Sequence, residues 1–313
     1  MKHRYIPHTV TLLAFLFLIG CGLQDKALQA DVTPTRIEVI PPSRTPPPTV
    51  QPTRTLTFTP IPTLSAQDAL EAFTNLIEED NECKLPCWLG VTPGQTKFEE
   101  VENIFSQFMS IAHTDFSSQW AFIRVFFPNF EAPIHDVATE INPAENGKVT
   151  RILVSAGAYQ DINGPRDYSN PEFQQLWQRY LVPGIFTTHG PPEKIFLDTT
   201  RIVADTAGPY PFVLWIVYPQ EGFLIRYQGV NSKIGDAIRI CPMRSSLAIK
   251  IWDTEESSYE EFIKNDGALG GPFSLGPQDI EEVTDFDVQS FYEVFKNGDI
   301  DTCFETPASI WPY

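Results

Sequence analysis

The five cysteines are the residues of this chain whose type and spacing could do chemistry. The first, Cys21, ends the run Leu18-Ile19-Gly20-Cys21, which follows a basic start and the mostly apolar residues 9–20. This pattern matches the lipobox of bacterial signal peptides, where the chain is cut before the cysteine and lipid is attached to its sulfur. The apolar run is too short to span a bilayer as a helix. We expect a lipid anchor on Cys21, with an ordinary signal peptide and an incidental cysteine as the alternative.

Cys83 and Cys87 stand three residues apart, with Pro86 between them. A disulfide across so short a loop is sterically possible and would stabilise the fold by about 2 kcal/mol in the chain-entropy treatment. A thioredoxin-like dithiol would have two intervening residues and a surrounding βαβ pattern, and the sequence has neither. We expect a structural disulfide, while pairing with a distant cysteine stays open.

Cys241 and Cys303 are solitary, so a zinc ribbon, which needs two close cysteine pairs, is disfavoured. Their pairing would close a large loop, contribute about 4 kcal/mol and tie the C-terminal segment to the sheet. Export favours oxidation. We expect this disulfide, but four cysteines allow three pairings, and the other two stay open, as do free buried cysteines.

The rest of the sequence offers little chemistry. It contains no nucleophile elbow, zinc-protease helix or phosphate-cradling loop. His113, His135 and His189 lie at no metal-ligand spacing, and we expect loop or surface positions for them. The acidic run Asn297–Asp301 lacks the glycine and the carboxylate of an EF-hand loop, which favours a solvated turn. We therefore expect no catalytic residue, metal site or cofactor.

Residues 66–313 hold 16 Lys and Arg against 37 Asp and Glu, a net charge of about −21. Nucleic acid and anionic lipid are poor partners for such a body, because phosphate binding needs a basic surface. Acidity mostly favours solubility, and binding of divalent cations or cationic polymers stays open. Paired carboxylates could also serve a hydrolase, although the sequence singles out no pair.

Composition divides the chain into three parts: a signal peptide with lipobox (1–21), a disordered tether (22–65) and an extracytoplasmic domain (66–313). Residues 32–65 contain nine Pro and nine Thr in 34 positions. Such a segment cannot bury a core and favours extended polyproline-like conformations. At about 3.1 Å per residue the tether could reach on the order of 130 Å.

Periodicity within the domain predicts an α+β fold, with small mixed or antiparallel sheets packed with helices. Helices are expected from capping patterns at Ser65/Asp68, Thr96/Glu99, Asn170-Pro171 and Asp285 or Asp287. Strands are expected at residues 120–127, 149–156, 212–218, 223–227, 234–241 and 247–252, and loops at 142–147 and 267–276. A helix, a break and strands follow Thr96 and again Asn170, which suggests two degenerate helix-plus-sheet units, 66–160 and 161–313.

Residues 83–96 read C-x3-C-W-x-G-V-T-P-G-x-T and precede an amphipathic helix. This motif, the Thr/Pro tether and the closing residues 303–312 resemble a recurrent pattern of uncharacterised bacterial lipoproteins. In element order alone, the turn and helix also resemble the small SmpA/OmlA (BamE-type) lipoprotein domain. Neither resemblance implies a catalytic residue.

The sequence therefore predicts a lipid-anchored, extracytoplasmic protein of the cell envelope whose domain is a non-catalytic binding or envelope-interaction module. Its expected partners are membrane lipid through Cys21 and an envelope protein, peptide or glycan, but no nucleic acid. The alternatives are an extracytoplasmic hydrolase that uses paired carboxylates and a purely structural spacer.

The anchor is tested by mass spectrometry of the protein purified from membranes. We expect a mature N-terminus at Cys21 that carries acyl chains, because the lipobox directs both cleavage and lipidation. The Cys21→Ser variant should lose the acyl mass and leave the membrane fraction, since one cysteine carries the whole anchor. An unmodified thiol at Cys21 would contradict the lipobox interpretation.

Overall fold

The computed structural model describes residues 63–78, 83–127, 134–159, 167–199, 210–231, 233–266 and 276–311. Cys21, the signal peptide, all but the last three residues of the tether, and residues 267–275 of the expected loop lie outside the described residues. No helix within these ranges is long and apolar enough to cross a membrane.

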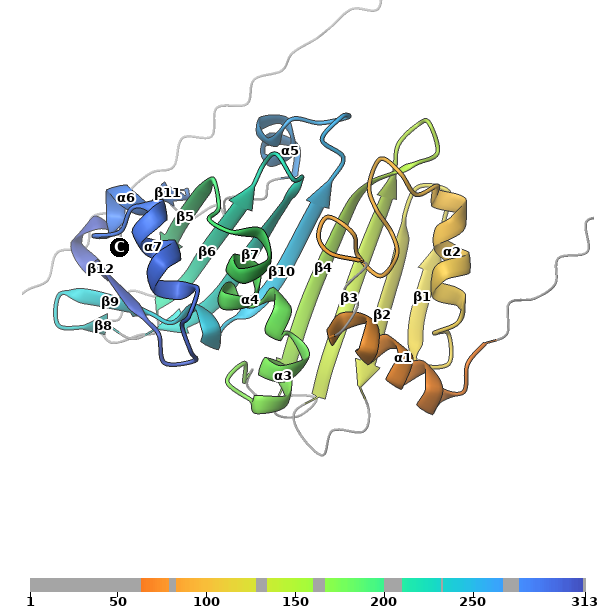
Figure 1. Ribbon diagram of the computed structural model, residues 1–313, viewed down its shortest axis with the longest axis horizontal. Coiled ribbons are helices and arrows are strands. Elements are labelled where there is room, and N and C mark those ends of the chain that lie inside the picture. The colour runs from red at the N-terminus through yellow and green to blue at the C-terminus, as the bar shows by residue number, and fades with distance from the viewer. Residues whose placement is uncertain are drawn as a thin grey trace, which may run out of the picture. The chain divides into compact units, whose positions relative to one another are not determined.

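Nine described strands form one antiparallel sheet in the order β1-β2-β3-β4-β10-β7-β6-β5-β11 (Figure 1). They are β1 (Ala112–Phe116), β2 (Ala121–Phe127), β3 (Ile134–Pro143), β4 (Val149–Tyr159), β5 (Lys194–Thr199), β6 (Tyr210–Tyr218), β7 (Phe223–Asn231), β10 (Ser246–Trp252) and β11 (Gln278–Asp279). A second sheet has the order β12-β9-β8. Its strands are β8 (Lys233–Ile234), β9 (Ala237–Ile240) and β12 (Phe304–Pro307).

The large sheet consists of two meanders, β1-β2-β3-β4 and β5-β6-β7-β10, which meet where β4 pairs with β10. Helices precede each meander in the chain. The α+β prediction is confirmed. The strand order is mirrored about the β4–β10 pair, while the division into two helix-plus-sheet units stays a prediction. The expectation of small sheets was wrong, because the pairing of β4 with β10 merges the two meanders into one sheet.

The helices are α1 (Ala66–Glu78), α2 (Phe98–Ser106), α3 (Pro171–Leu176), α4 (Val182–His189), α5 (Tyr259–Asp266), α6 (Ile280–Val283) and α7 (Val288–Phe295). There are also three 3₁₀ turns: η1 (Gln178–Tyr180) between α3 and α4, η2 (Pro242–Arg244) between β9 and β10, and η3 (Ala308–Ile310) after β12. Side chains cap three helices as expected. Ser65 accepts the N–H of Asp68, Asn170 accepts those of Glu172 and Phe173, and Asp287 accepts that of Ser290.

Two helix predictions need correction. The expected cap at Thr96 is wrong by one residue, because the Thr96 hydroxyl accepts the N–H of Thr92 and Glu100 accepts the N–H of Lys97 instead. The helix expected to begin at Asn170 is interrupted. α3 ends at Leu176, η1 follows it, and Leu181 is extended just before α4 begins. The apolar positions of this segment are nevertheless buried.

Alternating residues give the sheet two faces. One face joins α1, α2, α3, α4 and α7 in the main core, to which β3 and β4 contribute Val137 and Val154. The opposite face carries a smaller cluster of Trp215, Val217, Leu224, Trp252 and Phe262, the last from α5. Both faces of β6 therefore lie against apolar side chains, as its continuous apolar sequence predicted.

Tyr227 on β7 joins the sheet to the helical layer. Its side chain is fully buried, and its hydroxyl donates to the carbonyl of Tyr180 at 2.7 Å. Burial raises the pKa of Tyr227 well above its usual value, and the nearby Tyr218 adds to the shift. Tyr227 must therefore stay protonated for the fold to persist.

The Tyr227→Phe variant should lose about 1–3 kcal/mol of unfolding free energy at pH 7, because the Tyr180 carbonyl is left buried without its donor. Above pH 10 the wild type should itself weaken, since tyrosines ionise in the unfolded chain while Tyr227 cannot ionise in the fold. This loss reaches about 1.4 kcal/mol by pH 11. Urea unfolding at pH 7 and pH 11 should show that the unfolding free energies of the wild type and Tyr227→Phe converge at the higher pH. The control variant Tyr292→Phe should lose as much unfolding free energy between the two pH values as the wild type. A gap independent of pH would contradict this account.

Candidate functional site

The corner at Cys83–Thr96 is held together locally and pinned to the first meander. Cys83 and Cys87 form a disulfide, and Trp88 and Val91 exchange two backbone hydrogen bonds around a tight turn. Val149 at the start of β4 accepts the N–H of Gly94 and donates to the carbonyl of Thr96. The corner is therefore part of the folded domain and not of the tether.

Trp88 is the centre of this corner and is fully buried. Its indole N–H donates to the hydroxyl of Thr139 on β3 at 3.1 Å. Its ring stacks on Trp177 with centroids 6.2 Å apart and meets Tyr180 edge-on at 5.6 Å. The corner thus connects the first meander with the helices that precede the second.

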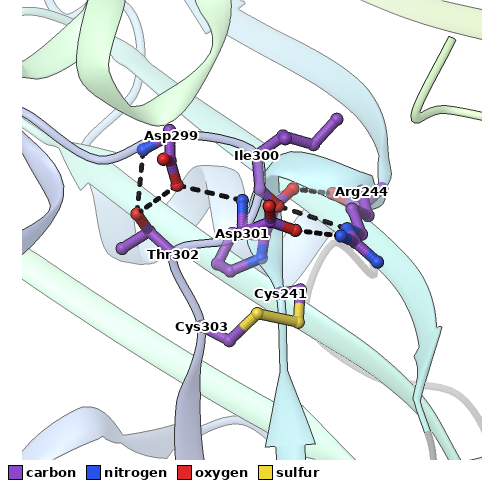
Figure 2. Close-up of a disulfide and its surroundings, with 9 residues drawn as sticks. Cys241, Arg244, Asp299, Ile300, Asp301, Thr302 and Cys303 are labelled. Carbon is purple, nitrogen blue, oxygen red and sulfur yellow. Dashed lines mark hydrogen bonds and ion pairs between the residues drawn. A yellow bond between two sulfur atoms is a disulfide. The ribbon is translucent and has the colours of Figure 1, made fainter.

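The second disulfide joins Cys241 to Cys303 (Figure 2). It lies next to the ladder of β9 and β12, in which Ile240 pairs with Phe304. Of the three possible pairings of four cysteines, the structure has the one that the sequence favoured. The bond fixes the segment that follows α7 to the segment that leads into η2.

The turn before Cys303 is also held by polar contacts (Figure 2). The Asp299 carboxylate accepts the Asp301 N–H and the Thr302 hydroxyl, both at 3.0 Å. Arg244 pairs with Asp301 and donates to the carbonyl of Ile300. The acidic run is thus an exposed turn organised by its own side chains, as expected.

A groove of about 770 Å³ lies between the two disulfide corners. Arg179 on one wall donates to the carbonyl of Cys83, while Met243 and Asp299 on the other come from the segments joined by Cys241–Cys303. The lining residues come from α1, α3, η1, α4, η2 and the turn after α7: Glu78, Gln174, Gln175, Leu176, Gln178, Arg179, Leu181, Pro183, Gly184, Thr187, Thr188, Met243, Gly298, Asp299 and Ile300.

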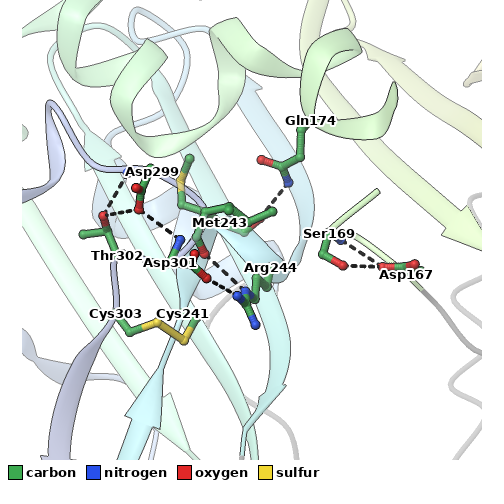
Figure 3. A network of polar contacts seen from close by, with 11 residues as sticks. Asp167, Ser169, Gln174, Cys241, Met243, Arg244, Asp299, Asp301, Thr302 and Cys303 are labelled. Carbon is green, nitrogen blue, oxygen red and sulfur yellow. Dashed lines mark hydrogen bonds and ion pairs between the residues drawn. A yellow bond between two sulfur atoms is a disulfide. The ribbon is translucent and has the colours of Figure 1, made fainter. Parts of the chain in front are cut away.

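Two contacts fix the shape of this groove. The Gln174 amide donates to the carbonyls of Tyr168 and Met243, both at 2.7 Å, and so joins α3 to η2 (Figure 3). Gly184 lies so close to η1 that a Cβ there would meet the Gln178 carbonyl oxygen at 2.3 Å. The walls are therefore set by backbone packing and a side-chain brace, which favours a site formed before any ligand binds.

The groove suits binding better than acid–base chemistry. Amide and hydroxyl side chains predominate among its polar groups, and Glu78 and Asp299 are its two carboxylates. The Thr302 hydroxyl and the Asp301 N–H lower the pKa of Asp299. A general acid of a glycosidase needs a raised pKa, so this shift runs opposite to what the hydrolase alternative requires.

No known protein family, curated protein or solved structure matches this chain.

The histidines do not assemble a site. His113 is exposed on β1, and His135 lies on β3. The expectation of a surface position was wrong for His189 at the end of α4, whose side chain is only 7% exposed. Its Nδ1 lies 2.7 Å from Glu221, and its ring meets Phe223 edge-on. Among the described residues, no three His, Cys, Asp or Glu side chains could hold a metal ion together.

A second hollow, of about 860 Å³, lies where α2 begins beside the β1–β2 and β3–β4 turns. Its lining comes from turns and from the first residues of α2, including Lys97, Glu99, Ser117 and Lys148. No disulfide borders it in the described part of the chain. The groove between the corners is the better candidate, because the Cys241–Cys303 bond and the Gln174 and Arg179 hydrogen bonds hold its lining segments together.

Removing the two disulfides should have unequal effects. The Cys241→Ala/Cys303→Ala variant should lose about 4 kcal/mol of unfolding free energy and Cys83→Ala/Cys87→Ala about 2, because the unfolded loops they close differ in length. The sequence separations are 62 and 4 residues. Urea unfolding of both double variants beside the wild type measures this order, and equal losses would show that loop closure does not set it.

Proposed function

We propose that this chain is a lipid-anchored, extracytoplasmic protein of the cell envelope whose domain binds a ligand in the groove between its two disulfide corners. The observation that carries the proposal is the groove itself, of about 770 Å³. The Cys241–Cys303 bond joins the segments that supply Met243 and Asp299 to its lining, and Arg179 ties the opposite part of the lining to the Cys83 carbonyl. Its volume falls in the range of small-ligand sites. The lipobox at Cys21 and the tether support the location.

The lining favours a peptide segment as the ligand. Gln175 and Gln178 are exposed and offer both a donor and an acceptor, which matches the alternation of N–H and C=O groups along a peptide. Half-buried Pro183 and Ile300 give apolar contact area beside them. A glycan would be expected to stack on an aromatic ring, and none of the described lining residues is aromatic.

Two sources of peptide fit this chemistry: a segment of an envelope protein and the stem peptide of the cell wall. Both present amide groups, so the lining does not separate them. The strongly acidic domain disfavours nucleic acid in either case.

The proposal is tested by titrating the full-length protein in detergent with three sets of probes: short peptides of varied sequence, cell-wall stem peptides and neutral oligosaccharides. We expect saturable binding to one of the peptide sets. The Gln175→Ala/Gln178→Ala variant should bind about thirtyfold more weakly, because each substitution removes a hydrogen bond that contributes about 1 kcal/mol. Its unfolding free energy should stay within about 0.5 kcal/mol of the wild type.

The matched control is Gln119→Ala, which removes an exposed amide from the β1–β2 turn and should leave binding unchanged. Blank titrations with all three sets, or peptide binding that the groove variant does not weaken, would overturn the proposal.

A further inference from the structure

The two edges of the large sheet differ. β11 ends one edge with only the two residues Gln278–Asp279, and α6 follows it directly. β1 ends the other with five residues, a continuous register against β2, and neither proline nor lysine (Figure 1). Short strands, proline, charged side chains and bulges are the usual means of blocking an edge against further pairing, and of these β1 has only the carboxylate of Asp115.

The hairpin register shows which groups of β1 face outward. Ser117 donates to the carbonyl of Trp120, so these residues form the hydrogen-bonded pair next to the turn. Because such pairs alternate along an antiparallel ladder, the backbone groups of Asp115 point to β2 and those of Thr114 point away. Ala112 fits this alternation, since its N–H donates to Phe108 and not to β2. The outward N–H and C=O of Thr114 and Phe116 have no partner among the described residues.

The sequence of β1, Ala-His-Thr-Asp-Phe, is complementary to itself when two copies run antiparallel about Thr114. In that register His113 lies opposite Asp115 of the other copy, and Asp115 opposite its His113. Both side chains are exposed and lie on the same face of the sheet. Half-buried Phe116 lies opposite small Ala112 on the other face. An imidazole N–H can donate to a carboxylate, and polar cross-strand pairs of this kind stabilise a sheet.

We propose that β1 pairs with β1 of a second copy of this chain, antiparallel and centred on Thr114, so that two nine-stranded sheets become one. The pairing would form four backbone hydrogen bonds: two between the Thr114 residues and two from Phe116 N–H to the carbonyl of Ala112. α2 contacts β2 on the helical face of the sheet. The self-complementary register of β1, in which each imidazole can donate a hydrogen bond to an opposite carboxylate, is what identifies a second copy, and not a foreign strand, as the occupant.

The register gives a cross-linking test in membranes that carry the full-length protein. In the proposed pairing the two Thr114 Cα atoms lie about 5.5 Å apart, within disulfide range. Identical residues at 113 or 115 are offset by two positions and lie about 8 Å apart, beyond that range. Thr114→Cys should therefore form a covalent dimer on mild oxidation, while His113→Cys and Asp115→Cys singly should not. The double variant His113→Cys/Asp115→Cys should cross-link again.

Charge variants test the same register without new thiols. His113→Asp places carboxylates opposite each other and should weaken self-association of the full-length protein in detergent by about tenfold. The exchange His113→Asp/Asp115→His places a histidine opposite an aspartate again. It should return the association constant to the wild-type value. Sedimentation equilibrium measures both.

Equal cross-linking at all three single positions would show random collision and overturn the proposal. A Thr114→Cys variant that stays monomeric in membranes would overturn the proposal as well. This is the result expected if a different protein occupied the edge. The wild-type chain, oxidised in parallel, is the control for cross-links through the native cysteines. None of these outcomes depends on the groove, so the proposed function can fail or stand independently.

Discussion

β4 and β10 pair along six residues, from Leu247 opposite Ala156 to Trp252 opposite Arg151. This pairing joins two meanders that are far apart in the sequence, and the rest of the structure depends on it. It brings side chains on one face of β3 next to the helices that precede the second meander. Trp88 then fills the space between them, bonded to Thr139 and stacked on Trp177. Neither half could bury this indole alone.

The groove is a consequence of the same arrangement. One wall reaches the Cys83–Cys87 corner through Arg179, and the other is fixed by Cys241–Cys303. The Cys241–Cys303 bond holds the turn before Cys303 in place, and the Asp299 carboxylate accepts two hydrogen bonds within that turn. Asp299 therefore helps to shape the groove wall. A rigid, mixed-polarity groove loses little entropy when a ligand binds, which favours recognition.

Sequence signals that act over a few residues correctly predicted helix starts and a hairpin. Ser65, Asn170 and Asp287 begin helices, and β6 with β7 forms the expected hairpin, because caps and turns act over a few residues. No comparable signal marks β1 or β3, whose polar and apolar residues alternate weakly and whose neighbouring strands decide their conformation. The pairing of β4 with β10 and the groove could not be predicted, since both bring together segments that are distant in the chain. The disulfides were predictable because cysteine spacing leaves few choices.

The acidity of the domain bears on what can approach it. A body with a net charge of about −21 repels another copy of itself at long range, although salt screens this beyond about 10 Å. Association at β1 must therefore come from short-range contacts: backbone hydrogen bonds and the opposition of His113 to Asp115. Such a small contact is weak in dilute solution. A lipid anchor would confine the copies to one surface and raise their effective concentration, while the long tether lets two domains turn toward each other. The proposed anchor, tether and edge pairing would thus act on the same equilibrium, and the edge alone would set its geometry.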